Sequence, residues 1–339
     1  MKISKSAQLV AILLVMAMAA FASCVSQKVI IFPEIAALAL GAWVMETPPW
    51  RGCSNLGLWL LPTLAALTGF LIIRFFPYSP FLMITAAFAL VALQLSLLRS
   101  PLSPALSAAV LPLVVHSSSW CYPAAVCTFS GIVAGGRYGR QYFPGRRKLF
   151  RERSRDKNRR LSNEMPSTDA GPTDIVAELI YWGKLLPFVM VVLAVAVEFH
   201  WIFIAAPPLL VAFAELAKPD DSFRARPFGV LVLLCGAALL GAAWLLFMRE
   251  VMHWPDCIAA GLILLSIFIL YHLMGLYFPP AAALGLLPLL LPKKALLLYP
   301  LEVFAGSVLF LVLSVGCFSG KRFFLPWRLV PLSRFNWPK

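Results

Sequence analysis

The sequence is poor in charged residues. Asp, Glu, Lys and Arg make up 13% of its 339 residues, whereas about 25% of the residues of a soluble globular protein are charged. Hydrophobic residues reach 61%, and the mean hydropathy is +0.85. These values exclude an ordinary soluble domain. They predict an all-α, polytopic membrane protein whose surroundings are the lipid bilayer.

Motifs of catalysis and of metal binding are lacking too. The seven cysteines form no CxxC pair, the four histidines are scattered, and no HExxH, GxSxG or phosphate-binding loop occurs. We therefore predict neither an enzyme nor a cofactor or metal. A lipid-modifying enzyme that uses none of these motifs is the third alternative for function, after the two given below.

Positive charge is concentrated at three places along the chain. Of a net charge of +14, most lies between Arg137 and Arg160, where eleven Lys or Arg residues accompany two acidic ones. Further basic residues lie in the C-terminal tail, and Lys2 and Lys5 precede the first apolar run. The positive-inside rule produces this distribution. We predict a multi-pass protein of the cell inner (plasma) membrane with both termini cytoplasmic and no nucleic-acid partner.

The first apolar run allows two interpretations. It is a transmembrane helix from about residue 7 to 23, or it is a lipoprotein signal sequence with Cys24 as the lipidated residue. We prefer the helix, because more apolar segments follow at once and a matching segment opens the second half of the chain.

A short apolar stretch occurs twice. Leu102–Val115 and Phe278–Leu291 align without a gap at an offset of 176 residues. Five identities result: Pro104 with Pro280, Ala105 with Ala281, Leu111 with Leu287, Pro112 with Pro288, and Leu113 with Leu289. A helix of about twelve of these residues covers roughly 18 Å of a hydrocarbon core about 30 Å thick. Short, proline-interrupted segments at matching positions of two halves indicate the substrate site of a transporter.

Other landmarks recur at nearly the same offset. Tyr122-Pro123 matches Tyr299-Pro300, Pro80 matches Pro255, and Pro33 matches Pro207. We predict two homologous halves of six apolar segments, each with a short proline-bracketed helix. The expected divisions are a first membrane repeat at 1–136, a basic cytoplasmic linker at 137–172, a second membrane repeat at 173–320 and a basic cytoplasmic tail at 321–339.

The number of crossings in each half decides how the repeats are related. If all six segments cross, both termini and the linker share one side and the repeats are parallel, which is our preferred topology. If the short stretches re-enter instead, each half crosses five times and the repeats are inverted.

The candidate substrate site lies between the two short stretches. Small residues there suit a ligand site and tight helix packing equally. His272, in the segment that leads to the second stretch, is a candidate proton relay or anion contact. The predicted site residues are Pro104, Ser107, Pro112, His272, Pro279, Pro280, Ala281, Gly285 and Pro288.

Three acidic residues lie in or near apolar segments. For Glu34 and Glu302, close to segment ends, we expect side chains that reach the membrane surface. Glu215, at the close of its segment, is a candidate gate or interface residue.

The second half resembles the HPP family of integral membrane proteins. The family signature, His-Pro-Pro followed by small residues, corresponds to Phe278-Pro279-Pro280-Ala281-Ala282-Ala283, with phenylalanine in place of histidine. Residues 200–318 carry the resemblance, and 30–136 carry a weaker copy with Ser103-Pro104 at the signature. It implies two fused domains of this family and a transport role, with nitrite as an expected substrate.

We therefore predict a transporter or channel for a small solute or ion, such as the inorganic anion nitrite, that works by alternating access. The alternative is a membrane scaffold or sensor subunit in which the repeats merely pack. The sequence is also compatible with a homo-oligomer.

Overall fold

The computed structural model describes residues 5–45, 50, 52–76, 78–142, 175–218 and 223–318. Helices and the turns between them account for all of these residues, and no strand occurs among them. Seven helices are long and apolar enough to cross a membrane. The prediction of a helical, multi-pass membrane protein is confirmed at this level.

Polar residues or prolines mark the starts of most of the seven candidate spans. Ser54 caps one of them by accepting a hydrogen bond from the Gly57 amide at 2.9 Å, and two others begin at a proline, which needs no partner for a backbone N–H. The spans are α1 (Lys5–Cys24), α3 (Asn55–Phe75), α4 (Pro80–Leu97), α8 (Ile175–Glu198), α10 (Pro227–Leu246) with its π-helical continuation η4 (Phe247–Met252), α11 (Asp256–Met274) and α13 (Lys293–Phe318).

An eighth long helix, α6 (Cys121–Tyr142), has 22 residues but is not among the candidate spans. Its last turns carry Arg137 and Arg140, which bond to the carbonyl oxygens of Cys53 and Trp43. The predicted boundary between repeat and linker at residue 136 therefore falls inside this helix. The rest of the linker, and the tail after Phe318, lie outside the described residues.

Four short helices are buried over their whole length. They are α2 (Glu34–Ala39), which continues as the π-helix η2 (Leu40–Val44); α5 (Pro104–Val114); α9 (Pro207–Leu216); and α12 (Pro279–Leu286), which continues as the 3-10 helix η5 (Leu287–Leu290). The 11 residues of α5 cover about 16 Å, roughly half of a hydrocarbon core. Our preferred topology, in which every segment crosses, differs from this arrangement of long and short helices.

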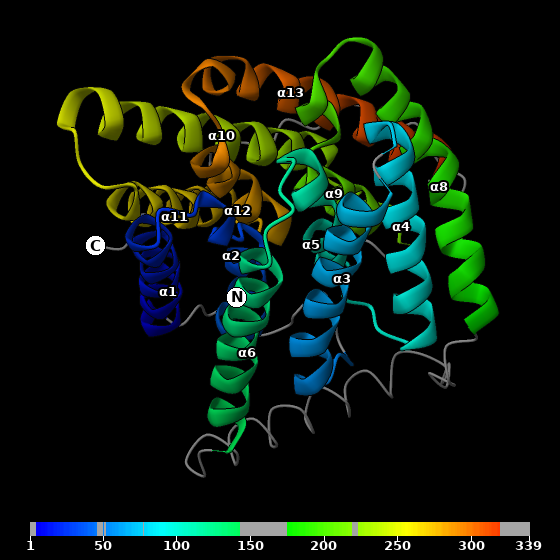
Figure 1. Ribbon diagram of the computed structural model, residues 1–339, viewed down its shortest axis with the longest axis horizontal. Coiled ribbons are helices and arrows are strands. Elements are labelled where there is room, and N and C mark those ends of the chain that lie inside the picture. Colours follow the sequence, from blue (N-terminus) through cyan, green and yellow to red (C-terminus); the bar gives the residue numbers. More distant parts are fainter. Residues whose placement is uncertain are drawn as a thin grey trace, which may run out of the picture.

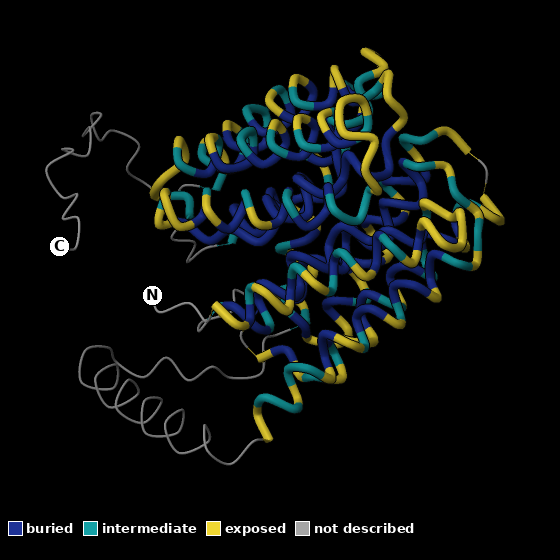
Figure 2. The backbone as a smooth tube through the Cα atoms, turned by 90° about the vertical axis from the view of Figure 1, so that its left-hand side faces the viewer, coloured by how far each residue is buried: buried dark blue, intermediate teal, exposed yellow. Residues whose placement is uncertain are grey.

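Helices that are far apart in sequence lie side by side (Figure 1). Helix α1 packs against α11, and α4 packs against α8. Around these pairs, α3 contacts α5 and α6, and α10 contacts α12 and α13. Burial is concentrated at the centre, and the outer faces of the long helices are exposed (Figure 2). Large apolar side chains on those faces, such as Leu13, Phe75 and Val312, are those expected to meet lipid.

Two glycines allow the short helices to contact the long ones closely. A Cβ atom on Gly69 of α3 would lie 2.0 Å from the carbonyl oxygen of Ala109 in α5. A Cβ atom on Gly241 of α10 would lie 2.1 Å from the carbonyl oxygen of Gly285 in α12. Since any side chain here would overlap backbone, these contacts require glycine.

Candidate functional site

The four short helices meet at the centre of the molecule. Helix α2 packs against α12 and α5, and α9 packs against α5 and α12. Helices α5 and α12 thus have α2 and α9 as their main short-helix neighbours. The sequence predicted a direct pairing of α5 with α12 and did not anticipate the part played by α2 and α9.

Most of the predicted site residues are buried in these helices. Pro104, Ser107 and Pro112 lie in α5, Pro279, Pro280, Ala281 and Gly285 lie in α12, and Pro288 lies in η5. His272 does not join them, because its side chain is exposed on α11. An exposed imidazole on the outer side of a helix cannot contact a solute held at the centre.

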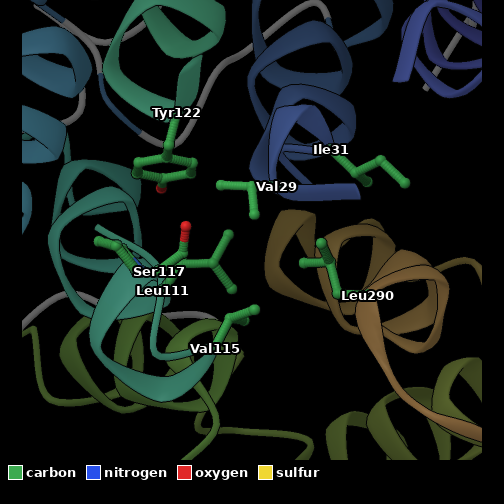
Figure 3. Close-up of a pocket in the computed structure, with 8 residues that line it drawn as sticks. Val29, Ile31, Leu111, Val115, Ser117, Tyr122 and Leu290 are labelled. Carbon is green, nitrogen blue, oxygen red and sulfur yellow. The ribbon is translucent and has the colours of Figure 1, made fainter. Parts of the chain in front are cut away.

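The ends of α5 and η5 approach each other at one small cavity (Figure 3). Leu111, Pro112 and Val115 line it from one side, and Leu290 lines it from the other. Val29, Ile31, Ser117 and Tyr122 complete the lining. Its volume of about 10 Å³ is about the space of one water molecule. The centre of the molecule is therefore closed in this conformation.

The prolines inside the short helices leave two carbonyl groups without a donor in their own helix, and tyrosine hydroxyls donate hydrogen bonds to these carbonyls. Pro112 has no N–H for the carbonyl of Ala108, four residues earlier, and the Tyr122 hydroxyl donates to that oxygen at 2.7 Å. Pro288 likewise leaves the carbonyl of Leu284 free. The Tyr299 hydroxyl donates to that oxygen at 2.6 Å.

This pairing answers a question left by the sequence. Prolines in the short helices free backbone groups that must be satisfied inside the protein or by water. The partners are the tyrosines of the repeated Tyr-Pro landmark, in α6 and α13. The similar spacing of proline and tyrosine in the two halves, 10 residues in one and 11 in the other, was visible in the sequence, but the hydrogen bond that explains it was not.

Glu34 is the most deeply buried acidic residue. It begins α2 and is 1% exposed. The Ser107 hydroxyl of α5 donates a hydrogen bond to its Oε1 atom, whereas its Oε2 atom has no partner. None of the ion pairs among the described residues includes Glu34. The expectation that this side chain reaches the membrane surface is wrong, since α2 begins inside the bundle.

Glu215 forms a second carboxyl-serine pair on α5. The Ser103 hydroxyl donates to its Oε1 atom, and the Lys218 ammonium group lies 2.8 Å from the same atom. The pair joins the beginning of α5 to the end of α9, and Lys218 compensates the charge. This position agrees with the predicted interface role of Glu215.

Glu302 has a backbone partner. Its Oε2 atom accepts a hydrogen bond at 2.8 Å from the Phe203 amide, in the 3-10 helix η3 (Ile202–Ala205) that precedes α9. The side chain is 7% exposed, so the expectation of a surface-reaching carboxyl is wrong here as well. Its observed contact is that of a helix cap.

No cluster of three or more His, Cys, Asp or Glu residues within the described ranges could hold a metal ion. The chain was compared with family models, with curated proteins and with solved structures, and it matches none of them. The resemblance to the HPP family remains a prediction.

Proposed function

We propose that the protein is a transporter of a small solute, with its site where α2, α5, α9 and α12 meet. The observation that carries this proposal is the pair of buried carboxyl groups, Glu34 and Glu215, which accept hydrogen bonds from a serine within α5 and from the serine that precedes it, in a largely apolar interior. Ionisable side chains are costly inside a membrane protein and are characteristic of substrate and ion pathways. Packing alone would be served as well by apolar residues.

We further propose that residues 5–142 and 175–318 are two repeats that interlock. Three features support this. The tyrosine–carbonyl contacts of Tyr122 and Tyr299 are equivalent, and so are the close approaches of Gly69 and Gly241. The pair α1–α11 matches α8–α4, and α2–α12 matches α9–α5.

This relation accounts for both the long and the short helices. Each proposed repeat contains four long helices when α6 is counted, which has 22 residues but is not among the seven candidate spans. If all four cross and the short helices do not, the number of crossings is even, and the termini and the linker lie on one side. Short helices of each half pack against short helices of the other half. A movement of one half relative to the other would therefore open the closed centre. Alternating access between repeats works in this way.

The substrate class follows from the donors at the centre. A protonated Glu34 is a hydrogen-bond donor at Oε2 that suits a small anion, and the Ser107 hydroxyl, which donates to Oε1, holds the carboxyl in place. Together with the resemblance to the HPP family, this makes nitrite the first solute to test. A carboxylate at the same place would repel an anion, so the proposal requires that Glu34 be protonated when the anion is bound.

Uptake by proteoliposomes tests this function. Purified protein is reconstituted, and the entry of isotopically labelled nitrite, nitrate and chloride is measured against protein-free vesicles. We expect uptake of at least one anion, and a loss of most of it in Ser107→Ala. Ser314→Ala is the matched control, because this equally buried serine of α13 bonds only to the Leu311 carbonyl of its own helix. Equal uptake by protein-containing and protein-free vesicles would contradict the proposal.

One observation favours a scaffold or sensor subunit instead. The cavity between the short helices holds about 10 Å³, and tyrosines already satisfy the carbonyl groups that the prolines free. A purely structural centre would have these properties. Absence of flux for all three anions, together with a stoichiometric partner in the purified material, would support this alternative.

A further inference from the structure

The unpartnered oxygen of Glu34 carries an inference that rests on the proposed transport function. Oε2 is buried and has no hydrogen-bond partner, while Oε1 has the Ser107 hydroxyl. An ionised carboxyl here would be a buried charge without a counter-ion, and a neutral one would be a donor without an acceptor. In either protonation state, the Glu34 carboxyl therefore lacks one partner in the closed conformation.

The elements packed against α2 supply no opposite charge. They are α1, η2, α5, α6 and α12. Helices α5 and α12 and the π-helix η2 contain no titratable residue, and the titratable residues of α1, Lys5 and Cys24, are exposed at its two ends. The two arginines of α6 bond to carbonyl oxygens at the far end of that helix.

Two tyrosine hydroxyls are close enough to act on the Glu34 carboxyl electrostatically. They are Tyr122 of α6 and Tyr299 of α13, and both already donate to backbone carbonyls. Neither is a cation, so neither can compensate a charge on Glu34.

We propose that Glu34 carries the proton that accompanies the transported anion. In the anion-loaded state, which needs more space at the centre than the closed conformation leaves, the carboxyl is a neutral acid next to the anion. When the halves move and the site opens to water, the acid gives its proton to water and becomes a carboxylate, which the Ser107 hydroxyl stabilises. The same carboxyl takes up one proton when the site faces the opposite side. One proton thus crosses with each anion, and the cycle leaves Glu34 unchanged.

A metal cation does not fit this place. Ca²⁺ and Mg²⁺ take about six or more oxygen ligands, whereas one carboxyl group and one serine hydroxyl are within reach of each other here. The neighbouring cavity of about 10 Å³ is lined almost entirely by apolar side chains and could not hold the missing waters. A proton requires no such space.

Gradient-driven uptake separates this inference from transport itself. Vesicles with wild-type protein should accumulate nitrite about tenfold for each unit of inward pH gradient, because one proton per anion couples one pH unit to a factor of ten. In Glu34→Gln, exchange of labelled for unlabelled nitrite should persist while the gradient has no effect. Glu302→Gln is the control, since this amide keeps the oxygen that accepts from Phe203. It should behave as wild type.

A second variant keeps the test informative if Glu34→Gln does not fold. Glu34→Asp keeps the acid but shortens the reach to Ser107, so we expect slower uptake that still responds to the gradient. Full gradient response in a folded Glu34→Gln protein would overturn the inference and leave the transport proposal intact.

An infrared measurement decides the matter if wild-type protein moves no anion. The proposal predicts a band from a buried, protonated carboxylic acid that is present in wild type and in Glu302→Gln but absent in Glu34→Gln. The same band in Glu34→Gln would overturn the proton site independently of any flux.

Discussion

A double-mutant cycle tests whether the tyrosines compensate for the prolines of the short helices. Replacing Tyr122 by Phe removes the hydroxyl that lies 2.7 Å from the Ala108 carbonyl. Because Pro112 cannot donate to that carbonyl, the oxygen is left buried without a donor. Such a loss lowers the free energy of unfolding by about 1–3 kcal/mol.

The cost should fall when the proline is removed as well. In Pro112→Ala, the new backbone N–H at position 112 can bond to the Ala108 carbonyl, as in an uninterrupted helix. Tyr122→Phe should then cost less by about 1 kcal/mol or more, which is the coupling energy of the cycle. Tyr299→Phe with Pro288→Ala should show the same coupling, because the Leu284 carbonyl has an equivalent contact at 2.6 Å.

Unfolding in mixed detergent micelles, followed by tryptophan fluorescence, gives the four free energies. Tyr271→Phe serves as the matched control: its hydroxyl is also buried and donates to a carbonyl, that of Phe278, at 2.7 Å, but Pro112 is not involved. Its effect should be additive with Pro112→Ala. Additivity of Tyr122→Phe with Pro112→Ala to within about 0.5 kcal/mol would refute the reasoning.

Three further predictions follow from single contacts. Gly69→Ala and Gly241→Ala should each destabilise the protein by about 3 kcal/mol, because the new Cβ would lie 2.0 or 2.1 Å from a backbone oxygen. Gly183→Ala is the control and should not destabilise the protein, because there is open space around Gly183. Thermal unfolding in detergent measures all three effects. Ser103→Ala should cost only about 1 kcal/mol in the same assay, since Lys218 still pairs with Glu215. His272→Ala should change neither stability nor anion uptake, because its side chain is exposed; a loss of uptake would restore it as a site residue.

The sequence predicted the elements of the centre better than their partners. Proline fixes where a helix can begin, and α5 and α12 do begin at prolines of the two repeated stretches, Pro104 and Pro279. Hydropathy located the apolar segments, but it did not separate the long helices from the short ones, since the preferred topology had every segment crossing. What it could not show is which short helix packs against which, because apolar surfaces of small residues do not specify a partner. The contacts of α2 and α9 depend on the whole fold.

Burial of the acidic residues was the largest error of the sequence-based interpretation. A glutamate near the end of an apolar segment usually extends to the membrane surface, and Glu34 and Glu302 matched that pattern. The pattern assumes that a segment end lies at the membrane surface. Helix α2 has only 6 residues, so its beginning lies within the bundle. The length of the segment, considered together with the position of the glutamate in it, was the information in the sequence that could have indicated burial.

The tyrosine contacts change which groups at the centre can bind a solute. The sequence placed the site at the two proline-interrupted stretches, whose inner prolines leave the carbonyls of Ala108 and Leu284 without a donor in their own helix. Tyr122 and Tyr299 occupy those carbonyls, so the prolines shape the short helices and offer a solute no unused acceptor. Among the side chains of α2, α5, α9 and α12, the buried oxygen without a partner is Oε2 of Glu34. If the centre binds a solute, the chemistry of recognition therefore depends on this carboxyl and on Ser107 beside it.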